Sequence, residues 1–421
     1  MKFNKSSQLL LASAVSLLAA GLLAACGSDT TDFVFVASSK AAGTNSYGQI
    51  DIFEVNSVSG AMRQIPSSPF PSGGRNPVAE AVSPDNTNLY VVNQDDNTIV
   101  QFVIGNDGKL YPQNTVNTAG TYPFAVAANG SNLFVLDTYQ PRACSTDSPC
   151  SGSIAVYPIQ TTDTLGSAVT NPSSGATYWP LTLPSSPTDL LEPTAINVPA
   201  SGAYVYVTAY DWTKSANYIF GFSVGSNGAL TTLNGGAPLA GGAFATGPCS
   251  STYLNAPYLA GTCPAAIASD STSSYVYVTD AENGTVHSYL VASGTGLLSE
   301  LSTPISAGGQ PLAIAVDTKY PYAYVTNAAG NVQAYSITSG SGALTSIGLY
   351  VAGIEPVAIG IDPSTNHFVF TVNFNPSETY GTVSDFQMST TAGTLINTQG
   401  SPYAGSAQLT AVAAVPHRGS H

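Results

Sequence analysis

The amino-acid sequence predicts an all-β fold, a single seven-bladed β-propeller of four-stranded blades, and three repeated features support this prediction. Short runs with a Tyr-Val-x-Val character recur along the chain, an aromatic residue lies in the run after each of them, and a Gly-x-Leu or Gly-x-Met turn usually follows. Runs of about five residues rich in Val, Ile, Tyr and Thr, bounded by turn residues, are typical of strands joined by hairpins. Four such strands cannot bury both faces of a small sheet, so the copies are expected to stack on one another.

The second strand of each unit supplies the first repeated feature, and the third strand and the next turn supply the other two. The second strands are expected to begin at or near Phe33, Leu89, Leu133, Tyr204, Tyr275, Tyr322 and Phe368. The third-strand aromatic residues are Phe53, Phe102, Tyr157, Phe222, Tyr289, Tyr335 and Phe386. The turn glycines are Gly60, Gly108, Gly228, Gly296, Gly342 and Gly393, and Asp163 takes their place in the remaining copy. A glycine suits these turns because hairpins often require a positive φ angle.

The first strand of most units opens with proline, and the exception predicts how the ring closes. The opening prolines are Pro77, Pro123, Pro193, Pro264, Pro311 and Pro356. The unit that starts at Phe33 lacks a first strand, whereas the last apolar run, Leu409–Val415, lacks the other three. We therefore expect residues 409–415 to pair with the three N-terminal strands of residues 33–65, which removes the open sheet edges. The propeller is predicted over residues 33–416, with a tail at 417–421.

The composition excludes one class of partner. The chain has 421 residues, of which only 8% are charged, and its 24 acidic residues against 10 basic ones give a formal net charge of −14. A strongly acidic protein repels phosphate backbones, so we do not expect it to bind nucleic acid.

The N-terminus is typical of an export signal. Lys2 and Lys5 precede an apolar stretch from Leu9 to Ala25 that is too short for a membrane span, which predicts a signal peptide over residues 1–25. The stretch ends in Leu-Ala-Ala-Cys at Cys26, which resembles the bacterial lipoprotein box. The resemblance implies a lipid on Cys26, a short tether over residues 26–32, and a location at the membrane surface of the cell envelope. The family's sorting rules imply the outer membrane, since Gly27 rather than Asp follows Cys26. The alternative is an ordinary secretory signal followed by a chance cysteine.

The repeat sequences themselves resemble a known family. Tyr-Val-Tyr-Val-Thr at 204–208 and 275–279, Tyr-Ala-Tyr-Val-Thr-Asn at 322–327 and the segment 83–93 carry the resemblance. They are similar to the YVTN-repeat propellers and to the seven-bladed lactonase family typified by 6-phosphogluconolactonase. The resemblance covers nearly all of the mature chain and implies the fold. It implies much less about activity, because the repeated residues are structural.

Long insertions all fall in links that a propeller places on one face, which we call the top face. A rigid scaffold commonly presents functional loops, so this face is the expected binding face, the alternative being that insertions are merely tolerated there. The insertions are Ser38–Gln49, Tyr139–Ser153, Gly166–Glu192, Tyr210–Asn217, Asn234–Cys263 and Phe374–Gly381.

The cysteines fit the same face. Cys144 and Cys150 bracket one insertion and Cys249 and Cys263 another, so an exported chain is expected to form two local disulfides, with Cys26 left for the lipid. Neither pair has Cys-x2-Cys spacing and no histidine is near, so no metal site is expected. No feature of the chain calls for a cofactor.

Candidate ligand-binding residues lie where the inner strands begin and in the insertions. Residues just before the inner-strand prolines should surround the channel opening: Asn76, Tyr122, Glu192, Gln310 and Glu355. The insertions add Trp179, Trp212 and Tyr210, whose rings suit stacking on sugars or contacts with a protein. The alternative is that these aromatic residues pack the long loops onto the scaffold.

Glu80 and Arg75 are the candidate catalytic pair. Glu80 occupies a first-strand position that is aliphatic in other copies, and a carboxylate there needs a partner or a raised pKa. Arg75 is the nearest basic residue in sequence. Lactone hydrolysis needs a base that activates water and a positive group for the oxyanion, which Glu80 and Arg75 would supply. The alternative is an interior ion pair that fixes blade packing.

Two functions follow from these features. The first is a ligand-binding or interaction module whose top face binds a small molecule, a glycan or a protein. The second is an extracytoplasmic, metal-independent lactonase. The resembled family tends to place His, Arg and Glu around its channel, whereas this chain has no histidine on an inner strand and few cations for a phosphorylated substrate.

Overall fold

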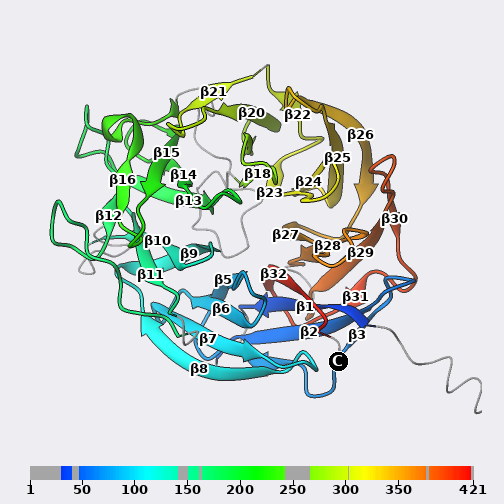
Figure 1. Ribbon diagram of the computed structural model, residues 1–421. Helices are drawn as coiled ribbons and strands as arrows, with labels where there is room; N and C mark the ends of the chain where they lie inside the picture. The colour runs from blue at the N-terminus through cyan, green and yellow to red at the C-terminus, as the bar shows by residue number, and fades with distance from the viewer. Residues whose placement is uncertain are drawn as a thin grey trace, which may run out of the picture.

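The computed structural model describes residues 30–39, 47–140, 150–160, 164–241, 266–301, 303–375 and 379–418, and these form a ring of seven blades around a central channel (Figure 1). The predicted fold class is therefore confirmed. Each blade is an antiparallel sheet; in six blades the strands run outward from the channel in chain order, and in the remaining blade the last strand of the chain is innermost. The only helical element in this part of the chain is the 3-10 turn η1 (Leu233–Gly236), and no helix there is long and apolar enough to cross a membrane.

The first four blades contain strands β1 to β17 together with β32. Blade 1 consists of β1 (Thr30–Ser38), β2 (Gln49–Asn56), β3 (Met62–Gln64), β4 (Phe70–Pro71) and β32 (Leu409–Pro416). Blade 2 consists of β5 (Pro77–Val82), β6 (Asn88–Asn93), β7 (Thr98–Ile104) and β8 (Leu110–Asn117). Blade 3 consists of β9 (Thr121–Ala128), β10 (Asn132–Tyr139), β11 (Ser153–Pro158) and β12 (Trp179–Pro180). Blade 4 consists of β13 (Leu191–Asn197), β14 (Tyr204–Asp211), β15 (Ala216–Val224), β16 (Leu230–Thr232) and β17 (Ala240–Gly241).

The other three blades complete the ring. Blade 5 consists of β18 (Ile267–Ser269), β19 (Tyr275–Asp280), β20 (Thr285–Val291), β21 (Leu298–Glu300) and β22 (Ile305–Ser306). Blade 6 consists of β23 (Pro311–Val316), β24 (Tyr322–Asn327), β25 (Asn331–Ile337) and β26 (Leu344–Val351). Blade 7 consists of β27 (Pro356–Ile361), β28 (Phe368–Asn373), β29 (Thr382–Met388), β30 (Leu395–Asn397) and β31 (Tyr403–Ala404).

The ring closes within blade 1, as predicted. Strand β1 pairs on one side with β2 and on the other with β32, so that Phe35 faces both Ile52 and Ala413. Strand β1 begins at Thr30, so the last residues of the predicted tether belong to the strand. The inner strands then contact one another in the order β32, β5, β9, β13, β18, β23, β27 and back to β32. This closure leaves each inner strand facing the channel.

The Tyr-Val-x-Val strands and the Gly-x-Leu turns contact each other between neighbouring blades. The ring of Tyr275 in blade 5 lies against Gly342 in blade 6, and a Cβ atom at Gly342 would come within 2.3 Å of it. The hydroxyl of Tyr277 donates to the Gly342 carbonyl at 3.0 Å. Gly342 also has a φ angle of 65°, a conformation that favours glycine. Equivalent tyrosine-to-glycine hydrogen bonds join Tyr206 to Gly296 and Tyr324 to Gly393.

The remaining repeated residues also have structural roles. The seven third-strand aromatic residues are all buried, with at most 3% of any of them exposed. The Asn or Asp that ends a second strand holds the link that enters the same blade: Asn327 Nδ2 donates to the Ala307 carbonyl at 2.8 Å, and Asp137 Oδ2 accepts from the Gly120 amide at 2.9 Å. The repeat sequence therefore specifies the scaffold and leaves the loops free to carry a site.

Candidate functional site

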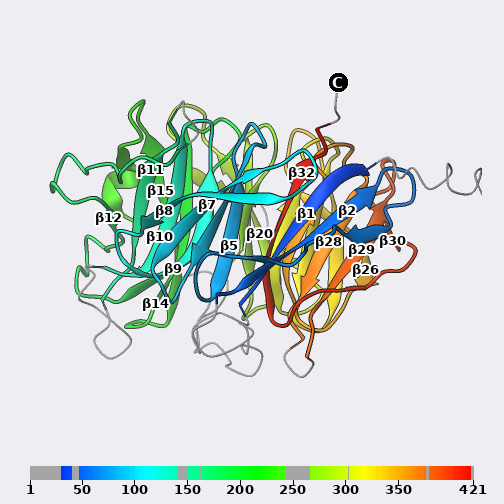
Figure 2. The ribbon, with the colours of Figure 1, turned by 90° about the horizontal axis from the view of Figure 1, so that it is seen from below.

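The residues that precede the inner strands lie together at one end of the channel, which we call the mouth. Strand β32 runs toward the C-terminus at the upper edge of Figure 2, so the inner strands begin, and the mouth lies, at the lower edge. The carbonyl groups of Asn76, Gln310 and Glu355 accept hydrogen bonds from Gln94, Ala328 and Phe374, which follow the second strands of their own blades. The mouth is therefore held by backbone hydrogen bonds.

Several mouth residues have left-handed backbone conformations. The φ angles are 54° at Asn76, 54° at Tyr122, 50° at Glu355 and 56° at Gln408. These four residues come from the adjacent blades 7, 1, 2 and 3. Such conformations are costly for residues other than glycine, so the surrounding fold must hold these four residues in place.

Glu192 is the most perturbed acid at the mouth. It lies on β13 opposite Tyr210, and only 8% of it is exposed. The indole Nε1 of Trp212 donates to its Oε2 at 2.6 Å. Burial raises the pKa of Glu192 to about 7, and the hydrogen bond from Trp212 partly opposes that rise. A carboxyl group that changes charge near neutral pH is suited to proton transfer and to hydrogen bonding in either protonation state.

Two aromatic pairs flank Glu192. Tyr210 and Trp212 meet edge to face with ring centroids 5.0 Å apart, and Tyr122 and Tyr139 do so at 5.8 Å. Trp212 keeps 43% of its surface exposed. Burial raises the pKa of Tyr139, and the charge of Glu192 adds to the rise. Together these residues form a partly open aromatic surface around an acid.

The loops of blades 3 and 4 hold this surface in place. The Trp212 amide donates to the Leu190 carbonyl at 2.9 Å, and the Leu190 amide donates to Thr213 Oγ1 at 3.0 Å. The ammonium group of Lys214 pairs with Asp189 at 2.5 Å. The end of the predicted insertion 166–192 is thereby fastened to the predicted insertion 210–217, and both lie at the mouth as expected.

The other side of the mouth contains acceptors that lack donors. Glu355 Oε2, Gln310 Oε1 and Asn375 Oδ1 are buried, and no donor within the described residues reaches them. Burial raises the pKa of the Glu355 carboxyl group. Buried acceptors are ordinarily hydrogen-bonded, so these three oxygens are an unusual feature of the mouth.

The predicted contact between Glu80 and Arg75 is wrong. The guanidinium Nε of Arg75 donates to Asp96 Oδ1 at 2.7 Å, and the two side chains form an ion pair at the mouth. Arg75 precedes the β-bulge at the start of β5 and turns outward, whereas Glu80 lies further along that strand. Neither carboxylate oxygen of Glu80 has a hydrogen-bond partner of normal geometry in the part of the chain described.

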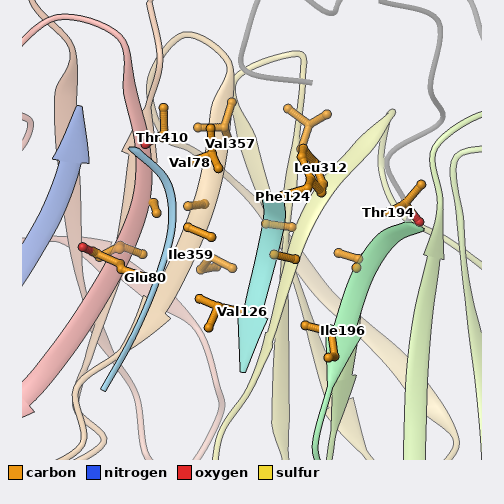
Figure 3. Close-up of a pocket in the computed structure, with 18 residues that line it drawn as sticks. Val78, Glu80, Phe124, Val126, Thr194, Ile196, Leu312, Val357, Ile359 and Thr410 are labelled. Carbon is orange, nitrogen blue, oxygen red and sulfur yellow. The ribbon is translucent and has the colours of Figure 1, made fainter. Parts of the chain in front are cut away.

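Glu80 borders a cavity in the channel, but its carboxylate group does not point into that cavity. The cavity has a volume of about 270 Å³, and its walls include Phe124, Thr194, Leu312 and Thr410 from the inner strands. Figure 3 shows the Glu80 carboxylate turned away from this space, on the side of β32. Burial raises the pKa of Glu80 to about 8, against a weak opposing contact with the Ala413 amide. The structure therefore removes the geometric basis for Glu80 and Arg75 as a catalytic pair.

Trp179 does not belong to the open surface either. Its side chain is 4% exposed and packs with Leu181, Leu183 and Leu191 in the core between blades 3 and 4. The expectation that Trp179 contacts a ligand is therefore wrong, because the pairing of β12 with β11 leaves its ring within the core.

Most of the predicted cysteine chemistry lies outside the described residues. Cys26, Cys144, Cys249 and Cys263 all fall there. Cys150 is disulfide-bonded, and its pairing with Cys144 stays a prediction. Among the described residues, no group of three or more His, Cys, Asp or Glu side chains is arranged to hold a metal ion.

Comparisons with known proteins agree on the architecture. A family model described as "Lactonase, 7-bladed beta-propeller" matches residues 33–179 and 276–408, well over half of the chain. The periplasmic gluconolactonase of Pseudomonas aeruginosa has a similar structure, with a TM-score of 0.65 and 16% identity over 92% of this chain and 99% of that one. A candidate 6-phosphogluconolactonase from Bacteroides fragilis has a TM-score of 0.64 and 18% identity over 92% and 99% of the two chains. No curated protein matches this sequence.

Proposed function

Because this chain belongs to the lactonase family of seven-bladed β-propellers, we propose that its mouth binds a small sugar-like molecule. The observation that carries the proposal is the hydrogen bond from Trp212 to the buried carboxyl group of Glu192, between two aromatic pairs. Aromatic rings pack on the apolar faces of sugar rings, while a carboxyl group accepts hydrogen bonds from hydroxyl groups. The mouth supplies both kinds of group within one opening.

The first test measures binding through Trp212. The chain has two tryptophans, and Trp179 is buried while Trp212 is partly exposed, so a change in fluorescence on titration with glucono-1,5-lactone and neutral sugars should come from Trp212. Glu192→Gln is expected to weaken binding roughly tenfold or more at pH 8, because it removes a charged hydrogen-bond acceptor. Unchanged affinity in Glu192→Gln would contradict the proposal.

A second variant tests the environment of Glu192. Trp212→Phe keeps an aromatic ring but removes the Nε1 donor, whose hydrogen bond lowers the pKa of Glu192. The midpoint at which Glu192 loses its proton should therefore rise above about 7. The measurement is a pH titration of the Glu192 carboxyl carbon by NMR, with Glu192→Gln used to assign the signal. A midpoint that stays the same or falls would show that the hydrogen bond does not act on this carboxyl group.

Hydrolysis of a sugar lactone is a second candidate function. Family membership and the raised pKa of Glu192 favour it, since a deprotonated Glu192 would act as general base on a water molecule. Turnover of a lactone panel should then rise with pH through about 7 and be abolished in Glu192→Gln. Binding without turnover would leave the protein as a binding module.

We also propose that the protein is exported and anchored to the cell envelope through a lipid on Cys26. The sequence before Cys26 supports this, and the disulfide bond at Cys150 is consistent with an oxidising compartment. Mass spectrometry of the membrane fraction, with Cys26→Ser as the comparison, tests it. A glycan or protein on the same top face is an alternative ligand.

A further inference from the structure

We propose that a proton shared between Asp32 and Asp362 clasps the ring at the junction where it closes, so that the closure is firmest in acid and weakens as the pH rises. We call this junction, between blade 7 and blade 1, the seam. Strands β1 and β32 pair there from opposite ends of the chain, and β32 also contacts β27 and β28 of blade 7.

The two acids belong to different blades but share one serine. Asp32 lies near the start of β1, and Asp362 directly follows β27, the inner strand of blade 7. The hydroxyl group of Ser364 donates to Asp32 Oδ1 at 2.6 Å, and the Ser364 amide donates to Asp362 Oδ1 at 2.8 Å. The two carboxyl groups therefore lie side by side across the seam, and a hydrogen bond joins them directly.

A proton is required for two carboxyl groups to form such a hydrogen bond. Neither Asp32 nor Asp362 exposes any surface to solvent, and two ionised carboxylates in contact away from water repel each other. The Asp362 oxygens accept hydrogen bonds from the Thr365 and His367 amides and from the Thr365 hydroxyl group, which favour its ionised form. The proton therefore resides on Asp32 and is donated to Asp362.

The pKa directions of the two acids agree with this assignment. Burial, followed by the charge of Asp362, raises the pKa of Asp32 from 3.8 to about 8. Burial also disfavours the ionised form of Asp362, but hydrogen bonds from Asp32, Thr365 and His367 outweigh it and lower the pKa of that carboxyl group. The stability that the clasp adds is therefore complete below pH 3.8 and is lost as the pH rises to about 8.

The acid pair distinguishes the seam from the two junctions before it in the ring. The turns after the inner strands of blades 5 and 6 also begin with acids, Asp270 and Asp317. The residue before the ring that packs on the next blade's turn glycine is Asp32 in blade 1, Pro321 in blade 6 and His367 in blade 7. Of these three junctions, the seam alone has a carboxyl group on both sides.

Other titratable groups lie on the elements around the pair, so the test needs a matched control. The charged or titratable side chains on these elements are those of Asp317, Lys319, His367, Asp385, His417 and Arg418. Asp385 is the best control, because it is also fully buried in blade 7 and burial raises its pKa to about 8. Its side chain accepts a hydrogen bond from Thr398 of its own blade.

The first measurement is a pH titration of the Asp32 carboxyl carbon in the full chain by NMR, with Asp32→Asn used to assign the signal. The midpoint is expected near 8. Asp362→Asn should lower it by about one pH unit or more, because the charge that retains the proton is gone. Ser364→Ala should raise it, since the hydroxyl group that stabilises ionised Asp32 is removed. Asp385→Asn should leave it unchanged.

The second measurement follows hydrogen exchange of the β1 amides from pH 5 to pH 9, corrected for intrinsic exchange rates. In Asp32→Asn the side-chain amide donates to Asp362 at every pH, so the variant does not depend on a proton. The ratio of β1 protection in Asp32→Asn to that in the wild type should rise about tenfold per pH unit up to pH 8 and then level off.

Each part of the inference can fail separately. A wild-type midpoint near 4, or one that Asp362→Asn leaves unchanged, would overturn the shared proton. A protection ratio that stays constant from pH 5 to pH 8 would overturn the clasp. If Asp362→Asn does not fold, the upward shift in Ser364→Ala decides in its place, and a midpoint that stays the same or falls in that variant would contradict the inference.

Discussion

Replacing Glu80 with Gln is expected to raise the free energy of unfolding at pH 7 by about 3 kcal/mol. The Glu80 carboxyl group is buried without a hydrogen-bond partner of normal geometry among the described residues, and burial raises its pKa from 4.5 to about 8. The folded protein therefore holds a proton that the unfolded chain releases above pH 4.5. The free energy of unfolding is therefore unaffected by Glu80 below that pH. Above it, the free energy of unfolding falls by roughly 1.4 kcal/mol per pH unit until the folded group ionises near pH 8. Gln remains neutral throughout and avoids this loss.

The measurement is urea unfolding of wild type and Glu80→Gln at pH 5, 6, 7 and 8. Burial also raises the pKa of Asp32 and of Asp385 to about 8, so the variant keeps a pH dependence of its own. The informative quantity is the difference in unfolding free energy between the two proteins, which should widen steadily with pH. Glu54→Gln provides the control, because Glu54 is partly exposed and pairs with the exposed Arg63. A difference that is constant from pH 5 to pH 8 would show that Glu80 is not a buried neutral acid.

Glu80 also illustrates what the sequence could not reveal about the site. The sequence correctly marks a carboxylate in an aliphatic position as unusual. It does not show whether the side chain points to the channel or to the neighbouring blade. In the structure Glu80 follows the β-bulge between Pro77 and Ala79, and its carboxylate is turned away from the channel cavity (Figure 3). Arg75, five residues earlier, is drawn instead to Asp96, which follows the second strand of the same blade.

The mouth was easier to predict than the contacts within it. Glu192 and Glu355 were found because six of the seven inner strands begin with, or close to, a recognisable Pro and small residues. Tyr139 and Asn375 were missed, since Tyr139 ends a second strand, Asn375 lies just after one, and no repeat marks either residue. Their neighbours, Tyr122 and the Glu355 carbonyl, approach them only in the folded ring. Trp179 and Trp212 looked alike in sequence, yet only Trp212 is exposed.

The scaffold was predictable because its two commonest motifs contact each other. A turn glycine and a second-strand tyrosine are expected in propellers separately, but the structure joins them between blades, as Gly342 does with Tyr275 and Tyr277. The same pairing recurs around much of the ring, so both residues recur at matching positions of the repeats and are easy to recognise in the sequence. Such a contact should be costly to disturb.

Replacing Gly342 with Ala is expected to lower the free energy of unfolding by about 2–4 kcal/mol. The φ angle of 65° is unfavourable for alanine, and the new Cβ would lie 2.3 Å from the ring of Tyr275, so that the ring or the turn must move. Moving the turn would also strain the hydrogen bond from Tyr277 to the Gly342 carbonyl. Thermal and urea unfolding, followed by circular dichroism, measure the loss.

Gly340 provides a matched control within the same turn. Its φ angle is 79°, but a Cβ atom there would meet nothing within 4 Å, so Gly340→Ala should cost only the backbone term of about 1–2 kcal/mol. The excess for Gly342→Ala isolates the contact with Tyr275. In a Tyr275→Ala protein, adding Gly342→Ala should cost only the backbone term, because the ring that clashes has been removed. An equal loss of unfolding free energy in the two glycine variants would contradict this. It would mean that the turn moves away from the ring at no cost and that the repeated glycine is needed only for its backbone conformation.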